Sequence, residues 1–303
     1  MVMQDHPLIS VVIPCLDHAQ ELTCCLRALS EQAFSLHFEI LVVDSAADPD
    51  VQAVVARFAH ARCVGSTAML GPGAARNLGV QQAAGKYLAF VDADCQPEPG
   101  WLAAAVSGLQ QGGRLVGGPV LSVNPRQIIQ VADNLLQFAD VGPGRPDQTT
   151  DHFPSCNMAI ARDDFLHLGG FPAGDFLACE DVQFCEQALA AWPRGLLFVN
   201  AMRIRHLGRG NLNEVWRHHR RFGHCRAALG LRLQPTHLRL GTHAIMIVPV
   251  MLKRYAYILR RIARWNRAGL LSAVLLSPLL LFGLAGWAVG FRRGCIEAAR
   301  GDR

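Results

Sequence analysis

Short apolar runs alternate with segments of helical periodicity along the first third of the chain. Three short apolar runs, the first of them rich in β-branched residues, predict buried strands over 8–14, 39–43 and 87–91. Between them, apolar residues recur at helical spacing and predict helices over 21–33, 51–59 and 74–84. Strands that alternate with helices in this way are typical of a mostly parallel, doubly wound sheet with flanking helices, so we predict an α/β fold.

The pattern becomes irregular and loop-rich over 100–205. The stretch 141–153 is polar and contains glycine and proline, which predicts a mobile loop. Helical periodicity returns over 181–191 and 212–229. No internal repeat or low-complexity tract is present, and we assign residues 1–230 to one α/β domain.

The C-terminal part of the chain has a different pattern. Residues 268–291 contain no charged side chain, and about 20 apolar residues are enough for a bilayer-spanning helix. We therefore predict a transmembrane helix there, with a buried C-terminal helix as the alternative. The uncharged stretch 240–252 is short for a span and predicts an interfacial or re-entrant helix. It would form part of a basic amphipathic segment over 231–267, and a basic tail would follow the span over 292–303.

Composition and charge agree with membrane contact. Charged residues make up 17% of the chain, against about 25% in soluble domains, and the apolar C-terminal part accounts for the difference. The formal net charge is +5, and the basic residues crowd between Arg203 and Arg267 and return at Arg292 and Arg293. Such a cluster suits anionic lipid or phosphorylated substrates. The N-terminal half has no basic stripe, which argues against nucleic-acid binding.

The cysteines and the N-terminus indicate the compartment. None of the 10 cysteines forms a Cys-x-x-Cys pair, and residues 1–7 lack the basic start and apolar core of a secretory signal. We interpret the cysteines as reduced thiols in a domain that faces the cytoplasm. Six basic residues lie over 253–267, just before the predicted span, and favour the same orientation. The expected location is the inner (cytoplasmic) membrane.

Polar residues stand where the three predicted strands end. Pro14 ends the first strand, Asp44 follows the second, and Asp92 and Asp94 follow the third. In open α/β sheets the ligand lies beyond the carboxyl ends of the strands, so we expect these residues at one site. Two carboxylates one residue apart suit a hard cation such as Mg²⁺ or Mn²⁺, with an aspartate-rich turn as the alternative. Asp44 suits a hydrogen bond from a ribose or a base, or else a helix N-cap.

Further positions along the chain carry candidate chemistry. Arg76 lies early in a predicted helix, where its forked donors and the helix dipole suit a phosphate. Glu180 and Asp181 begin another helix, a position that the dipole favours whatever their function. His206 is a metal ligand or an ordinary surface histidine. The basic stretch 217–221, which includes His218 and Arg221, suits a diphosphate or acidic lipid, or is a solvated helix face.

Taken in order, these pieces resemble glycosyltransferase family 2, the inverting transferases of the GT-A fold. The matching motifs are Ser10-Val11-Val12-Ile13-Pro14, Val42-Val43-Asp44-Ser45, Ala75-Arg76-Asn77-Leu78-Gly79, Phe90-Val91-Asp92-Ala93-Asp94, Ser155-Cys156-Asn157-Met158-Ala159-Ile160, Gly169-Gly170-Phe171 and Glu180-Asp181. Each motif alone is weakly specific, but their order and spacing over residues 8–226 make a strong joint signal.

The resemblance implies a donor site that contains a divalent metal, Mn²⁺ or Mg²⁺. Asp44 would contact the nucleobase, and Pro14 and Arg76 would contact other parts of the nucleotide. Asp92 and Asp94 would hold the nucleotide and the metal. His206 matches a histidine that some relatives use as a further metal ligand.

On the acceptor side, the resemblance implies that Asp181 is the catalytic base for the acceptor hydroxyl. Asn157 and Glu180 would line the acceptor and sugar site. Processive synthases carry Gln-x-x-Arg-Trp, but here the nearest match is His218-x-x-Arg221-Phe222, which weakens a polymerase interpretation. The predicted acceptor is a lipid-linked molecule or a saccharide in envelope polysaccharide or glycolipid synthesis.

Other functions fit the sequence less well. A nucleotide-dependent dehydrogenase would need Gly-x-Gly-x-x-Gly after the first strand, but Pro14-Cys15-Leu16-Asp17 stands there. A single predicted span beside a large polar domain argues against a transporter or channel. A non-catalytic, membrane-anchored protein that binds nucleotide-sugars on the same fold remains the alternative.

Overall fold

The computed structural model describes residues 6–16, 18–66, 68–172, 178–230 and 240–300. Asp17, the N-terminal residues 1–5, the start of the predicted amphipathic segment (231–239) and the end of the basic tail (301–303) lie outside the described residues. The chain forms two compact units. The first unit comprises residues 1–120, 146–175 and 180–206, and the second unit comprises 121–145, 176–179 and 207–303. The helix predicted over 212–229 therefore packs with the C-terminal helices and not within the predicted domain 1–230.

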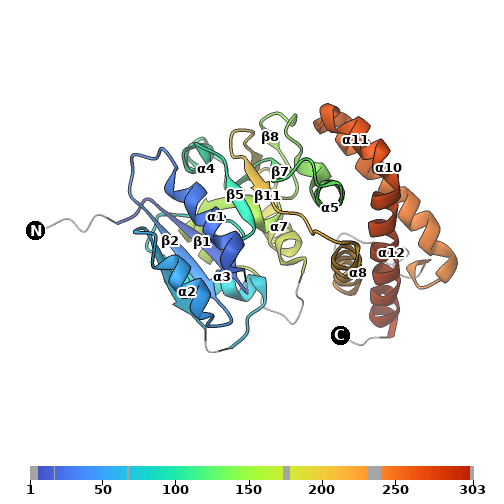
Figure 1. Cartoon of the computed structure of the whole chain (residues 1–303), viewed down its shortest axis with the longest axis horizontal. Helices are drawn as coiled ribbons and strands as arrows, with labels where there is room; N and C mark the ends of the chain where they lie inside the picture. Colours follow the sequence, from blue (N-terminus) through green and yellow to red (C-terminus); the bar gives the residue numbers. More distant parts are fainter. Residues whose placement is uncertain (1–5, 17, 67, 173–177, 231–239, 301–303) are drawn as a thin grey trace, which may run out of the picture. The chain divides into compact units, whose positions relative to one another are not determined.

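An eight-stranded sheet forms the centre of the first unit (Figure 1). Its order is β3-β2-β1-β4-β9-β6-β10-β8. The bounds are Ile9–Cys15 (β1), Phe38–Asp44 (β2), Ala61–Gly65 (β3), Tyr87–Phe90 (β4), Leu115–Gly117 (β6), Gln148–Thr149 (β8), Met158–Ala161 (β9) and Leu196–Phe198 (β10). Only β8 and β9 run against the other strands, so the prediction of a mostly parallel sheet is confirmed.

The three predicted strands correspond to β1, β2 and β4. Their residues are almost entirely buried, as expected for strands covered on both faces. The edge strand β3 was missed, because Val64 is its one buried residue and its sequence lacks an apolar run. The predicted loop over 141–153 is irregular except for a short 3-10 turn (Ala139–Val141) and β8, which pairs with β10.

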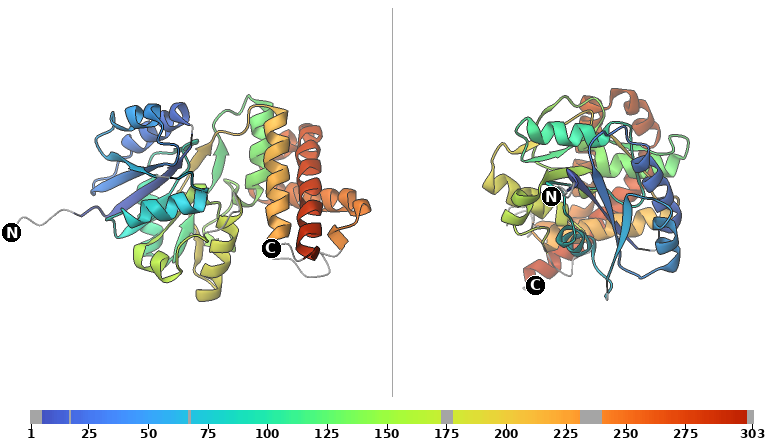
Figure 2. Two further views of the ribbon diagram at one scale, coloured as in Figure 1. Left: turned by 90° about the horizontal axis from the view of Figure 1, so that it is seen from below. Right: turned by 90° about the vertical axis from the view of Figure 1, so that its left-hand side faces the viewer.

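Helices cover both faces of this sheet. Figure 2 (left) shows α1 (Ala19–Ser30) and α2 (Pro49–Val55) on one face and α3 (Pro72–Gln81) on the other. Helix α3 approaches the strands closely, because a Cβ at Gly79 would lie 2.4 Å from Val12 Cγ1. The remaining helices of the unit are α4 (Trp101–Gln110), α6 (Arg162–His167) and α7 (Glu180–Ala191).

Strand register brings polar residues of the first unit together. The parallel pairing of β1 with β2 places Cys15 opposite Asp44 at the carboxyl ends of both strands. A second, three-stranded sheet has the order β5-β11-β7, with bounds Cys95–Pro97, Ile204–His206 and Val120–Ser122. Antiparallel pairing of β5 with β11 places His206 opposite Cys95, next to Asp94.

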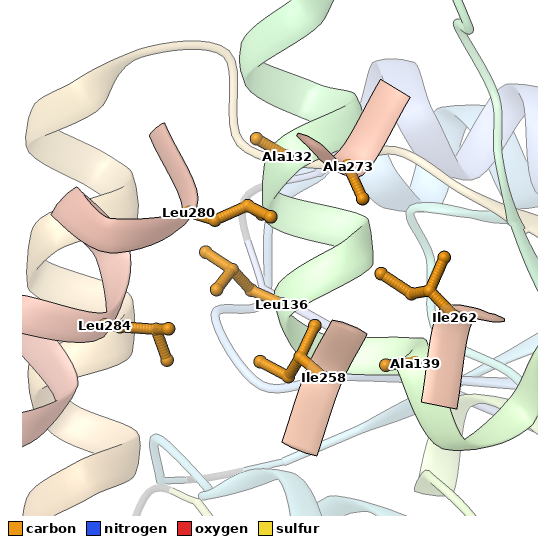
Figure 3. Packing of buried hydrophobic residues seen from close by; sticks show 8 residues of the cluster. All are labelled: Ala132, Leu136, Ala139, Ile258, Ile262, Ala273, Leu280 and Leu284. Carbon is orange, nitrogen blue, oxygen red and sulfur yellow. The ribbon is translucent and has the colours of Figure 1, made fainter. Parts of the chain in front are cut away.

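The second unit is helical. Its main helices are α5 (Ile128–Phe138), α8 (Leu212–Ala228), α10 (Ile247–Trp265), α11 (Leu270–Leu275) and α12 (Ser277–Arg300), with 3-10 turns over Ala244–Met246 and Arg267–Gly269. Figure 3 shows its apolar core, in which α5, α10, α11 and α12 meet. The core residues are Ala132, Leu136, Ala139, Ile258, Ile262, Ala273, Leu280 and Leu284.

The predicted span over 268–291 is not one helix. A 3-10 turn, α11 and a break at Leu276 occupy its first part, and α12 continues beyond it to Arg300. Among the described residues, α12 is the one helix long and apolar enough to cross a membrane, and 56% of its apolar window is buried. A single helix of this kind is weak support for a span, since buried core helices meet the same criteria.

Helix α12 packs closely along the polar helix α8. Every fourth residue of α12 over 286–294 is a glycine, and a Cβ at each would come close to an α8 backbone carbonyl. The pairs are Gly286 with Trp216, Gly290 with Arg220, and Gly294 with His224. This face of α12 is covered by protein, which agrees with the alternative prediction of a buried C-terminal helix.

Candidate active site

A buried arginine lies at the centre of the acidic cluster in the first unit. The Arg76 side chain is 1% exposed and extends from α3. Its guanidinium donates to Asp92 Oδ1 at 2.5 Å and to Glu180 Oε1 at 2.8 Å. Burial alone would lower the pKa of Arg76, but the two carboxylates outweigh burial and raise it. The two terminal nitrogens of Arg76 therefore hold Asp92 and Glu180 in position, while its Nε is buried and has no hydrogen-bond partner among the described residues. The expected contact of Arg76 with the nucleotide stays a prediction.

Glu180 and Asp181 begin α7 and have different environments. Burial raises the pKa of Glu180, although Arg76 opposes this, and Ser155 Oγ donates to Glu180 Oε1 at 3.3 Å. For Asp181, burial is outweighed by His152 and by the Val182 N–H, so its pKa is lowered. His152 Nε2 lies 3.6 Å from Asp181 Oδ2, too far for a direct hydrogen bond but close enough for electrostatic attraction. Asp181 is thus ionised and does not contact Arg76 directly.

The sequence analysis missed His152. It lies in the polar stretch predicted as a loop, where a histidine has no periodicity to mark it. Only the fold brings it to Asp181, 29 positions further along the chain. The one signal was its residue type, because a histidine near neutral pH can pair with a carboxylate.

A second cluster combines Asp94, Cys95 and His206. His206 Nε2 lies 3.4 Å from Asp94 Oδ2, and Cys95 Sγ lies 3.6 Å from Asp94 Oδ1. One potential ligand atom from each residue lies within 4.8 Å of the others. His206 is 4% exposed, so it is not an ordinary surface histidine. From the sequence, Cys95 had been interpreted only as a reduced thiol, without a ligand role.

The donor set of this cluster fits a divalent cation. Carboxylate oxygen and imidazole nitrogen suit Mn²⁺ and related ions. Burial raises the pKa of Cys95 well above its usual value, so its thiol is protonated. Asp92, in contrast, is bound to Arg76 and is not a member of this cluster. The two aspartates that the sequence analysis placed on one cation therefore have separate partners.

Asp44 offers a buried acceptor at the end of β2. The residue is 1% exposed, and its Oδ1 accepts from the Ala46 N–H at 3.1 Å. Its Oδ2 is buried and has no hydrogen-bond partner among the described residues. A buried carboxylate oxygen without a partner is costly, so a ligand donor at this position would stabilise it. Pro14 is half-buried on β1, one residue before the partner of Asp44.

Asn157 has a structural place instead of the expected one on the acceptor side. Its side chain is 0% exposed. Its Nδ2 donates to the Pro119 and Met202 carbonyls, at 3.1 and 2.9 Å, and its Oδ1 accepts from Trp101 Nε1 at 2.9 Å. Because these bonds use its polar groups and no surface is open, we do not retain Asn157 as a ligand-binding residue.

His218 and Arg221 lie on α8 in the second unit. Arg221 is exposed, while His218 contacts Gln137 Oε1 at 2.9 Å. The exposed guanidinium of Arg221 is accessible to the expected lipid or diphosphate. His218, in contrast, belongs to a hydrogen-bond network within the protein. The sequence analysis did not identify this network, because its members are scattered along the chain.

The centre of the network in the second unit is Asp133, which is fully buried on α5. His219 Nε2 lies 2.9 Å from its Oδ1, and the Arg209 N–H donates to Oδ2 at 3.0 Å. Burial opposes ionisation of Asp133, but His219 and Arg209 hold its pKa below the usual value. Burial also lowers the pKa of His219. Both lowered pKa values are consistent with a neutral His219 that donates a hydrogen bond to an ionised Asp133.

A family model matches the stretch of the chain that contains most of the acidic site. The chain belongs to glycosyl transferase family 2, whose model matches residues 10–169, more than half of the chain. The matched stretch contains Asp44, Arg76, Asp92, Asp94 and Asn157, and it ends before Glu180, Asp181 and His206. The family that the sequence motifs predicted is therefore confirmed.

Two named relatives are similar to part of the chain. Glycosyltransferase AglE of Haloferax volcanii is 35% identical over 191 residues, which are 61% of this chain and 62% of that protein. Uncharacterized glycosyltransferase YibD of Escherichia coli is 32% identical over 94 residues, 30% of this chain and 27% of YibD. The chain thus spans less than two thirds of either relative.

Solved structures share the fold. Mannosyltransferase PcManGT from Pyrobaculum calidifontis, in complex with GDP-Man and Mn²⁺, has a TM-score of 0.60 at 20% identity over 99% of this chain and 89% of its own. TarS 1-349 of S. aureus, in complex with UDP-GlcNAc, has a TM-score of 0.55 at 16% identity over 97% and 92%. These likenesses establish the GT-A fold.

Proposed function

We propose that this glycosyltransferase moves a sugar from a nucleotide-sugar donor to an acceptor hydroxyl, with a divalent cation and with inversion. The observation that supports this most is the charge balance of the site. One buried arginine, Arg76, stands against the carboxylates of Asp92, Glu180 and Asp181, and Asp94 lies in the same strand-end segment. The excess negative charge is of the kind that a divalent cation balances.

Asp94 and His206 would hold the cation. Charge on the departing nucleoside diphosphate is neutralised by such a cation when it is bound. Asp44 would accept a hydrogen bond from the nucleobase or ribose through its unpartnered Oδ2. Pro14 would border the nucleotide. Arg76 would act indirectly, by keeping Asp92 and Glu180 in position.

Asp181 would be the base. Its lowered pKa keeps it ionised at neutral pH, so it can accept the acceptor proton. Glu180 is less suited, because Arg76 and Ser155 both donate to its Oε1 and the Arg76 cation is paired with it. A base on the face of the sugar opposite to the leaving diphosphate permits a single displacement, and a single displacement inverts the anomeric centre.

The second unit would bring the enzyme to a membrane acceptor. No aspartate or glutamate occurs between Glu214 and Glu297, a stretch rich in arginine. Near the start of α10, Ile245, Val248 and Leu252 are exposed. Exposed apolar side chains beside basic ones suit an anionic membrane surface. We therefore propose a lipid-linked or envelope saccharide acceptor at the cytoplasmic face of the inner membrane, with α10 in the interface.

Thermal unfolding of the full chain tests the proposed donor chemistry. A matching nucleotide-sugar should raise Tm in the presence of Mn²⁺, because a ligand that binds the folded state stabilises it. Asp94→Asn should abolish the Mn²⁺-dependent part of the shift, and Asp50→Asn, at an exposed helix start, should not. If no nucleotide-sugar shifts Tm with or without Mn²⁺, the proposal is wrong. Binding without sugar transfer or donor hydrolysis would instead identify a non-catalytic binding protein.

A further inference from the structure

The cluster of Asp94, Cys95 and His206 contains a sulfur atom that the proposed sugar transfer does not use. Cys95 is fully buried and extends from β5. The pairing of β5 with β11 fixes it opposite His206, and its neighbour Asp94 supplies the third potential ligand. Oxygen, nitrogen and sulfur ligands are therefore combined at one place, whereas a hard cation requires only the first two.

The spacing within this cluster fits tetrahedral coordination. Zinc binds sulfur at about 2.3 Å, nitrogen at about 2.0–2.1 Å and oxygen at about 2.0–2.2 Å. Tetrahedral angles then place nitrogen about 3.3–3.5 Å from oxygen, and sulfur about 3.5–3.7 Å from oxygen. The observed separations are 3.4 Å for His206 Nε2 to Asp94 Oδ2 and 3.6 Å for Cys95 Sγ to Asp94 Oδ1. These two contacts involve different oxygens of the Asp94 carboxylate, so the carboxylate would turn to present one oxygen to both partners.

We propose that Asp94, Cys95 and His206 form a site for a thiophilic divalent cation, Zn²⁺ above all, which displaces the hard cation and inhibits the enzyme. The inference rests on the proposed function in that Asp94 and His206 are taken as the ligands of the hard cation. Zinc binds such ligands more tightly than Mn²⁺, and a thiolate increases the difference. On binding, the Cys95 S–H bond is replaced by a sulfur–metal bond, and the proton leaves to solvent.

Inhibition follows from the number of coordination positions that the protein leaves open on each cation. Three protein ligands leave one position on a tetrahedral ion. A six-coordinate ion such as Mn²⁺, held by Asp94 and His206 alone, leaves several positions for diphosphate oxygens. Cys95 therefore determines which class of cation the site retains.

Cobalt spectroscopy on the full chain tests the sulfur ligand without an activity measurement. Co²⁺ replaces Zn²⁺ and gives a near-ultraviolet thiolate-to-cobalt charge-transfer band when a cysteine binds it. The wild type and Cys295→Ser, which alters a buried cysteine of the second unit, should show the band. Cys95→Ser and Cys95→Ala should lack it, with circular dichroism confirming that they fold. A wild type that binds Co²⁺ without the band overturns the proposal, and so does a band that persists in both Cys95 variants.

Competition between metals alone separates this inference from the proposed function. Free Mn²⁺ is measured by electron paramagnetic resonance while Zn²⁺ is added. Cys95→Ser should reduce the preference for Zn²⁺ over Mn²⁺ at least ~10-fold and leave Mn²⁺ affinity unchanged, consistent with the loss of one soft ligand. An unchanged preference would overturn the role of Cys95 and leave the proposed function intact. Unchanged Mn²⁺ affinity in Asp94→Asn would overturn the proposed metal site itself.

Discussion

Each unit of the molecule contains a buried ionic cluster. In one cluster a cation is surrounded by carboxylates, and in the other a carboxylate is surrounded by hydrogen-bond donors. In the first unit one cation, Arg76, holds two carboxylates, and a third carboxylate, Asp181, stands beside them. In the second unit one anion, Asp133, accepts hydrogen bonds from Arg209, His219 and Gln137. The first cluster has excess charge that the protein does not balance, while the second is satisfied by its own residues.

This difference indicates that the first cluster is a binding site and that the second has a structural role. A buried charge is costly unless it is paired and hydrogen-bonded, so the protein retains unbalanced charge mainly where a ligand will balance it. Asp133 has no such need, because its donors come from α5, α8 and the segment before α8. We therefore expect substitutions in the first cluster to affect chemistry, and substitutions in the second to affect stability.

Asp181→Asn should give the largest effect. The amide keeps the shape of the side chain but cannot accept a proton, so sugar transfer should fall ~10²–10⁴-fold while donor affinity changes little. Steady-state kinetics and calorimetry with the donor measure the two quantities. Asp50→Asn, at the exposed start of α2, is the matched control and should behave like the wild type. Transfer within a few-fold of the wild type would show that the base is another residue.

Arg76→Gln should destabilise the first unit strongly. It leaves the Asp92 and Glu180 carboxylates without their shared cation, and loss of one partner of a buried ion pair costs about 3–5 kcal/mol. Arg76→Lys keeps the charge but not the forked geometry, so its free energy of unfolding should lie between those of the wild type and Arg76→Gln. Urea denaturation gives the free energy of unfolding. A stable Arg76→Gln protein that binds donor normally would contradict the positioning role of this arginine.

His219 in the second unit should make the stability of the protein depend on pH. The folded-state pKa of His219 lies below its unfolded value of about 6.5, so the unfolded state binds more protons as pH falls. The stability that neutral His219 contributes is present above about pH 6.5 and is lost as pH falls through the folded-state pKa. The free energy of unfolding, measured from pH 7.5 to 5, should fall less steeply in His219→Gln. Parallel curves for both proteins would show that His219 is not the titrating group.

Arg260→Gln should give the smallest effect. Arg260 is exposed on α10, and one basic residue near an anionic membrane contributes about 1 kcal/mol, or ~5-fold in affinity. Co-sedimentation with phosphatidylglycerol vesicles measures the change, and phosphatidylcholine vesicles should bind both proteins weakly. Arg57→Gln, exposed in the first unit, should leave binding unchanged. Equal losses for both variants would mean that net charge, and not α10, directs binding.

The sequence by itself determined the features that depend on neighbouring residues. Apolar runs predicted β1, β2 and β4, and the aspartates that follow them marked one edge of the sheet. Helical periodicity predicted α1, α7 and α8 within a few residues of their observed ends. These patterns are readable because a buried strand or an amphipathic helix imposes its period on consecutive side chains.

Only the tertiary structure determined which residues contact each other across long separations in the sequence. Arg76 and Glu180 are 104 positions apart, and no local pattern shows that they form a buried ion pair. The register of β5 with β11 joins His206 to Cys95 and Asp94. Hydropathy cannot distinguish a helix in lipid from one packed on protein, because both present apolar surface. The contact of Gly290 with the Arg220 carbonyl, one helix backbone against another, exists only in the folded chain.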